Sequence, residues 1–132
     1  MKIVASGKRK TAVARAVLVE GTGKITINKK DYQTLNFLDK LKIEEPLRIT
    51  QDIIGSLKFD AEITVKGGGE KGQVEAARVA LANAISTFSK SKKLTSTFLD
   101  YDRNMLVADV RRKETCKPGD SKARSKRQSS KR

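Results

Sequence analysis

The segment VKGGGEKGQV, residues 65–74, has the glycine spacing of loops that bind phosphate groups. A Walker loop also needs Lys-Ser or Lys-Thr after its last glycine, to reach the phosphates and hold magnesium, but Gln73 and Val74 stand there. A dinucleotide-binding loop needs an acidic residue about 20 positions further on to bind the ribose, and Lys92 and Lys93 occupy that region. The segment therefore does not predict a nucleotide cofactor.

Two roles stay open for these glycines. A glycine-rich turn exposes backbone N–H groups at the start of a helix, where the helix dipole favours anions, so an RNA phosphate could dock between Lys66 and Lys71. Alternatively, the glycines only permit a tight turn between a strand and a helix. The sequence alone does not choose between these roles.

The residues needed for catalysis or for a metal centre are scarce. The chain has no histidine, which removes the usual base at neutral pH and the commonest metal ligand. Its one cysteine, Cys116, cannot form a zinc cluster or an internal disulfide, and a protein without disulfides suits a reducing cytosol. Asp100 and Asp102 are close enough to pair, but turn and capping roles explain them first. We therefore expect a protein that is not an enzyme and that has no cofactor.

Positive charge dominates the composition and is concentrated at the two ends. The net charge is +14 and the pI is near 10.1. Residues 1–15 carry +5, residues 111–132 carry +8, and the 95 residues between them carry only +1. Mixed charges are expected of an ordinary surface, whereas segregated cations indicate a polyanionic partner, here a nucleic acid. No apolar run is long enough for a membrane span, and no export signal precedes the first charges.

The basic ends contain almost no aromatic residues; Tyr101 is the ring nearest to the tail. Proteins that recognise single-stranded bases usually stack them on rings, so the pattern favours recognition of phosphates and shape. Arginine and lysine then act as charges and as donors to phosphate oxygens. A merely solvated tail and a general RNA-binding or DNA-compacting protein are the alternatives that charge alone leaves open.

Hydrophobic alternation predicts three strands. Residues 11–20 place three valines on one face and Ala12, Ala14, Ala16 and Leu18 on the other, and the turn at 21–24 then predicts a hairpin with a strand over 24–28. Residues 59–66 alternate in the same way.

Helical signals follow. Asp31 can cap a short helix to about residue 38, and residues 44–57 suggest a helix with Pro46 in its first turn and Gly55 at its end. Apolar spacing predicts a long helix over 70–88 and a shorter one over 91–99, with an irregular stretch over 100–110. The fold class is therefore α+β, a mixed sheet with helices packed on one face. Residues 1–110 form the globular RNA-binding domain and residues 111–132 an extended basic tail.

Three segments, SGKRKTAVARAVLVEGTGKITIN, VKGGGEKGQVEAARVALANAI and SKARSKRQSSKR, resemble the S9 family of small-subunit ribosomal proteins. The resemblance covers essentially the whole chain in the same order. The stretch DYDRNMLVADVRRKE and the form of the tail are more similar to the archaeal and eukaryotic-cytosolic members than to the bacterial ones. Val110 stands where these members usually carry proline, so the backbone that leads into the tail is expected to differ there.

The resemblance implies a fold like the second domain of ribosomal protein S5, with a left-handed βαβ crossover. It implies a place in the head of the small subunit of a cytoplasmic ribosome, on the 3′ major domain of the rRNA and beside neighbouring head proteins. It also implies that the tail reaches the anticodon stem-loop of the peptidyl-site tRNA. The residues expected to contact rRNA are Lys8, Arg9, Lys10, Arg15, Lys66, Gly67, Gly68, Gly69, Lys71, Gly72, Gln73, Arg111, Arg112, Lys113, Lys117, Lys122 and Arg124. Those expected to contact tRNA are Lys126, Arg127, Gln128, Ser130, Lys131 and Arg132.

Overall fold

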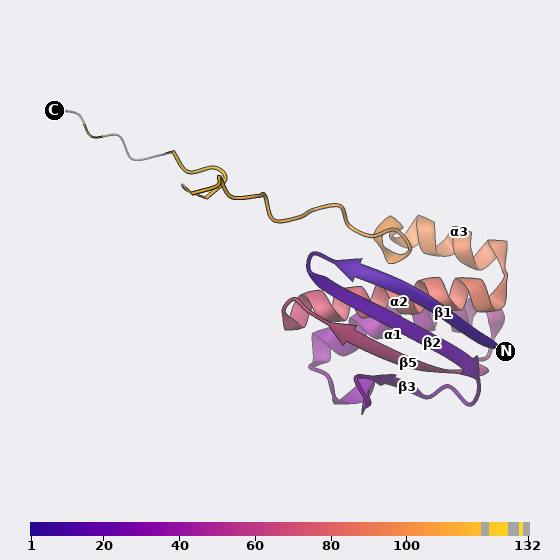
Figure 1. Ribbon diagram of the computed structural model, residues 1–132. Helices are drawn as coiled ribbons and strands as arrows, with labels where there is room; N and C mark the ends of the chain where they lie inside the picture. The colour runs from indigo at the N-terminus through magenta and orange to yellow at the C-terminus, as the bar shows by residue number, and fades with distance from the viewer. Residues whose placement is uncertain (120–121, 127–129, 131–132) are drawn as a thin grey trace.

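A five-stranded mixed sheet with the strand order β1-β2-β5-β3-β4 forms one layer of the computed structural model, and helices form the other (Figure 1). The structure describes residues 1–119, 122–126 and 130. The strands are β1 (Lys2–Arg9), β2 (Ala12–Glu20), β3 (Ile25–Ile27), β4 (Lys30–Asp31) and β5 (Phe59–Lys66). The helices are α1 (Phe37–Ile54), α2 (Glu70–Ser89) and α3 (Lys92–Tyr101), with 3-10 turns at Tyr32–Thr34 and Arg103–Met105. The predicted α+β class is confirmed.

The predicted hairpin between β2 and β3 is wrong. Strand β2 pairs antiparallel with β1 on one side and with β5 on the other, and β3 lies beyond β5, parallel to it. The turn after β2 therefore crosses the end of β5, where Asp60 accepts hydrogen bonds from the N–H groups of Thr22, Gly23 and Lys24 at 2.9–3.0 Å. These bonds lower the pKa of Asp60. Local turn chemistry could not show that β5, from residue 59 onward, inserts between the two strands.

Strand β1 was not predicted from the residue pattern, and it forms one edge of the sheet. Its register with β2 runs from Lys2 opposite Val19 to Arg9 opposite Ala12. The small residue Gly7 allows β1 to lie directly on α2: a Cβ atom there would be 2.4 Å from the Ala76 carbonyl oxygen. Basic residues and a glycine obscure the alternation that marks a strand, so the strand signal is weak.

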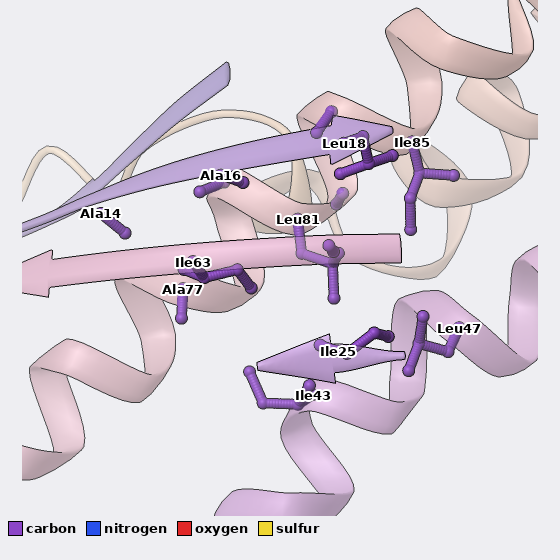
Figure 2. Packing of buried hydrophobic residues seen from close by; sticks show 14 of the residues in the cluster. Ala14, Ala16, Leu18, Ile25, Ile43, Leu47, Ile63, Ala77, Leu81 and Ile85 are labelled. Atoms are coloured by element: carbon purple, nitrogen blue, oxygen red, sulfur yellow. The ribbon is translucent and has the colours of Figure 1, made fainter. Parts of the chain in front are cut away.

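The core lies between the sheet and the helices (Figure 2). The face of β2 that carries small side chains is fully buried in this core, together with alternate residues of β5 and the apolar face of α2. The buried residues include Ala12, Ala14, Ala16, Leu18, Ala61, Ile63, Val65, Ala77, Leu81 and Ile85. Alanines allow the strand and α2 to approach closely. The valines Val4, Val13 and Val19 on the opposite face of the sheet remain 40–49% exposed. One face of the sheet is thus covered and the other is open.

Helix α1 differs most from its prediction. It begins at Phe37 rather than near residue 44, and Pro46 lies inside it. Asp31 caps only the 3-10 turn, because the backbone is extended at Leu35 and the turn does not continue into α1. Buried side chains at Asp39, Ile43, Pro46, Leu47 and Thr50 follow helical spacing across the proline, and this packing offsets the hydrogen bond that proline cannot donate.

The other predicted helices are confirmed within a residue or two at their ends. Gly55 ends α1, α2 occupies the predicted segment, and Ser91 caps α3 by accepting a hydrogen bond from the N–H of Leu94. The crossover from β3 through α1 to the parallel strand β5 is present. The left hand implied for it stays a prediction.

The described part of the tail, residues 111–119, 122–126 and 130, contains no helix or strand, and the chain leads away from the body after α3 (Figure 1). The boundary expected between residues 110 and 111 stays a prediction. Four residues expected to contact tRNA, Arg127, Gln128, Lys131 and Arg132, lie outside the described residues. Among the helices that the structure describes, none combines the length and the apolar character required to cross a membrane.

Candidate nucleic-acid interface

Three basic segments that are far apart in the sequence meet at one end of the sheet. The β1–β2 turn, residues 8–12, lies beside the end of β5, because Lys8 pairs with Val13 and Val13 with Lys66. The start of the tail also reaches this turn: Arg112 Nη1 donates to the Lys10 carbonyl oxygen at 3.1 Å. We call this region the cationic end, comprising residues 8–15, 66–73 and 109–113.

Exposed cations lie in rows on the open face of the sheet at the cationic end. Lys8 and Lys66 flank Val13 in register, and Arg15 lies two residues further along β2, between Ser6 and Thr64. Residues in register across neighbouring strands are about 5 Å apart and point to the same face. Lys8, Lys66 and Arg15 form no ion pair with any described residue. Their charges are therefore available to phosphate groups.

Arg9, by contrast, is engaged within the protein. Its side chain is 15% exposed, and Nε donates to Glu75 Oε2 on α2 at 2.6 Å, while Nη1 lies 3.4 Å from Asp109 Oδ2. Lys42 Nζ of α1 also reaches Glu75, at 3.4 Å. Burial pushes the pKa of Glu75 upward, but Arg9 and Lys42 outweigh this and hold the pKa below its ordinary value. Arg9 thus joins β1, α2 and the start of the tail.

Asp109 fixes the path of the chain as it enters the tail. Its carboxylate accepts hydrogen bonds from Arg111 Nε at 2.9 Å, Arg111 Nη2 at 2.7 Å and the Arg111 backbone N–H at 2.9 Å. These bonds and the nearby Arg9 hold the pKa of Asp109 far below its ordinary value. Val110, between the two partners, is 88% exposed. The contacts therefore form with an exposed valine at position 110.

The glycine loop has structural reasons for its composition. Gly67 and Gly68 have φ of +77° and +66°, and a Cβ atom on Gly67 would lie 2.7 Å from the Thr11 carbonyl oxygen. The side chain of Gln73 closes the loop by donating to the Gly67 carbonyl oxygen at 3.1 Å. Gly69, in contrast, has an extended φ of −96°, and nothing lies within 4 Å of its Cβ position. The first two glycines thus serve the turn, and Gly69 leaves space open beside the start of α2.

Lys71 pairs within the protein rather than standing free beside the loop. Its Nζ donates to both carboxylate oxygens of Asp39, at 2.9 and 3.1 Å, and Asp39 is only 1% exposed. The hydrogen bonds with Asp39 raise the pKa of Lys71. The pair joins α1 to α2, a role that sequence spacing could not show because 32 residues separate the partners.

The remaining predicted lysines and arginines fall into two groups. Arg124 pairs with Glu114 at 2.6 Å, and Lys117 donates to the Ser125 carbonyl oxygen at 3.1 Å. Lys10, Lys113, Lys122 and Lys126 form no ion pair with the described part of the chain. A Cβ atom on Gly72 would lie at ordinary contact distance from the β1–β2 turn, 3.7 Å from the Arg9 carbonyl oxygen and 3.8 Å from Ala12 Cβ. Sequence reasoning missed Glu75, Asp39 and Asp109, whose roles depend on partners distant in the sequence or on an irregular segment.

Residues that could hold a metal ion do not gather among the described residues: no three of the types His, Cys, Asp and Glu lie together. Cys116 is exposed and forms no disulfide.

Comparison with known proteins gives a consistent result. The sequence profile of the family described as "Ribosomal protein S9/S16" matches residues 7–132. A "Small ribosomal subunit protein uS9" of Methanococcus vannielii is 46% identical over 134 aligned positions, covering 98% of each chain. Proteins with the same name in two strains of Methanococcus maripaludis, C7 and C5, are 44% identical with the same coverage.

Proposed function

The chain belongs to the ribosomal protein S9/S16 family, and from that membership we propose that its cationic end binds the rRNA of the subunit head while its tail reaches the peptidyl-site tRNA. Membership of this family establishes that the protein is a structural constituent of the small ribosomal subunit in the cytoplasm and is not an enzyme. The rRNA and tRNA contacts are the proposed part.

The observation that carries the proposal is the meeting of the two basic ends. Residues 1–15 and 111–132 hold almost all of the net charge, and the Arg112–Lys10 contact joins them at one end of the sheet, beside the Arg9–Asp109 pair. A single RNA surface can therefore contact both segments. Cations that neutralise phosphates gain affinity from counterion release, and this gain does not depend on sequence.

The tail suits a partner that must be held without being identified. Its described residues are almost all exposed and include no aromatic side chain. Phosphate contacts position a nucleic acid but carry no sequence information, so such a tail can hold any tRNA. A chain segment without a core of its own becomes ordered only on its partner.

Salt dependence tests the rRNA contact. If six to ten phosphates are neutralised, log K for the full-length protein and small-subunit rRNA should fall with log salt by about 0.7–0.9 per contact. An affinity that barely changes with salt would contradict the proposal. A general RNA- or DNA-binding protein fits the charge as well, but it would be removed from small subunits by a high-salt wash before sedimentation.

Deletion of residues 128–132 tests the tail. We expect the body to keep its melting temperature, because this polar and cationic segment has no apolar side chain to contribute to a core. Retention of peptidyl-site tRNA by small subunits that carry the truncated protein should fall, measured by filter binding. Equal retention by truncated and intact subunits would refute the role proposed for the tail.

A further inference from the structure

A second basic cluster lies at the corner between α2 and α3. Lys90 follows the last turn of α2, and Lys92 and Lys93 begin α3; all three are exposed. None of them forms an ion pair with a described residue. The sequence is free of acidic residues from position 76 to position 99, so the cluster has no acidic neighbour along the chain.

The near-neutral charge of the body conceals this cluster. Four of the seven acids of α1, α2 and α3 are paired elsewhere: Asp39 with Lys71, Glu44 with Lys40 and Arg48, Glu45 with Arg78, and Glu75 with Arg9 and Lys42. These pairs lie along α1 and the first half of α2. These pairs are therefore distant from the α2–α3 corner. Asp52, in the last turn of α1, forms no ion pair with a described residue, but this one acid does not offset three lysines.

The corner has the shape and donors for a phosphate backbone. A shallow cleft of about 370 Å³ lies between Lys90 and Lys92, lined by the hydroxyl-bearing residues Ser86, Ser91 and Thr95. Ser86 and Thr95 share a hydrogen bond of 2.7 Å that joins the two helices. Lysine ammonium groups and hydroxyls are common donors to phosphate oxygens.

The corner and the cationic end are far apart. Figure 1 shows the turn between α2 and α3 at the opposite end of the sheet from the β1–β2 turn. Helix α2 has 20 residues, which corresponds to a length of roughly 30 Å. The exposed cations of the cationic end lie on the open face of the sheet, whereas the α2–α3 corner belongs to the helical layer on the other face. One straight RNA helix cannot lie against both faces, so each site requires its own RNA segment.

We propose that Lys90, Lys92 and Lys93 form a second, independent RNA-binding site, which contacts the phosphate backbone of an rRNA segment different from the one at the cationic end. The inference rests on the proposed rRNA binding, which supplies the class of ligand. By holding two segments about 30 Å apart, the protein acts as a spacer between them in the folded rRNA. An acidic face of a neighbouring protein is the alternative partner for these lysines.

Neutralising the pair at the start of α3 tests the site in the isolated protein. Lys92→Gln/Lys93→Gln should reduce the salt slope of rRNA binding by about 1.4–1.8, since two phosphate contacts are lost. Folding should not suffer, because lysines near a helix N-terminus oppose the helix dipole. The matched control is Lys29→Gln/Lys30→Gln, an equal charge change at the exposed β3–β4 turn. An equal decrease in slope for both variants, or no decrease for the first, would overturn the proposal.

Tethered cleavage in reconstituted small subunits separates this proposal from the broader one. Cys116→Ser removes the native thiol, and an iron chelate is then attached through Lys92→Cys or, separately, through Lys8→Cys. We expect each probe to cleave the rRNA backbone, at two different segments. Cleavage of rRNA from position 8 alone, including the case in which the probe at position 92 cleaves only a neighbouring protein, overturns the second site only. Cleavage from neither position overturns the rRNA contact of the proposed function as well.

Discussion

Alanine substitutions along the glycine loop separate a structural role from an RNA-clasping role, because the four glycines have different surroundings. For Gly67→Ala, a left-handed backbone costs about 1–2 kcal/mol. The new Cβ atom must also move away from the Thr11 carbonyl oxygen, which lies 2.7 Å from its ideal position. With this overpacking, the total loss of unfolding free energy should be about 2–4 kcal/mol. Gly68→Ala has a similar φ and a closest contact of 3.0 Å, so about 1–3 kcal/mol is expected.

The other two glycines serve as controls within the same loop. Gly69→Ala meets no atom within 4 Å and has an extended φ, so its unfolding free energy should stay within about 0.5 kcal/mol of the parent. Gly72→Ala lies in the first turn of α2 with contacts of 3.7 and 3.8 Å, and the higher helix propensity of alanine should stabilise it by up to about 1 kcal/mol. The expected order of stability is therefore Gly72→Ala, then Gly69→Ala, then Gly68→Ala, then Gly67→Ala.

Thermal unfolding followed by circular dichroism measures these differences. For a domain of this size, 1 kcal/mol corresponds to about 4 °C, so Gly67→Ala should melt roughly 8–16 °C below the parent. Equal melting temperatures for all four variants would refute the structural reasoning. RNA affinity is then measured for Gly69→Ala and Gly72→Ala, which remain folded: a loss of affinity in Gly69→Ala alone would indicate that the open space beside Gly69 receives a phosphate.

Two further perturbations test the internal pairs. Lys71→Met should lower the melting temperature more than Asp39→Asn does, because the first leaves a buried carboxylate unpaired whereas the second leaves a lysine in water. The double variant should recover part of the loss. Weaker RNA binding with an unchanged melting temperature would instead make Lys71 an RNA contact. Asp109→Asn should speed hydrogen exchange of the Arg111 amide at neutral pH, since the anionic acceptor is lost. The lowered pKa of Asp109 means that its contacts persist above about pH 4, the unfolded value, and weaken only as the pH falls through the lower folded value; loss of protection already at pH 6 would contradict this.

The strands and helices with uninterrupted patterns could be predicted from the sequence. Alternation over residues 59–66 and apolar spacing over residues 70–88 gave β5 and α2 because each element buries one face against the core. The start of α1 and the strand β1 could not be predicted in this way. Pro46 is typical of a helix start, yet side-chain packing stabilises a helix that continues across it. Gly7 weakens the strand pattern of β1, because the position requires a residue small enough to lie directly on α2.

The pairing of strands illustrates the same limit. The turn at residues 21–24 has the glycine and polar residues of a hairpin, but β5 lies between β2 and β3. Turn chemistry determines how the chain bends, and it does not determine which strand becomes the neighbour. That choice depends on which strand buries the most apolar surface, and the strand concerned begins more than thirty residues later.

The sequence by itself indicated the class of partner: no histidine, one cysteine and a net charge concentrated at the two ends disfavour catalysis or a metal site and favour a polyanion. It could not distinguish cations available to that polyanion from cations used within the protein. Arg9 and Lys71 are as basic in the sequence as Lys8 and Lys66, yet they pair with Glu75 and Asp39 across 66 and 32 residues. Ion pairing depends on distances of a few ångströms, and only the packing of α1, α2 and β1 brings those partners together.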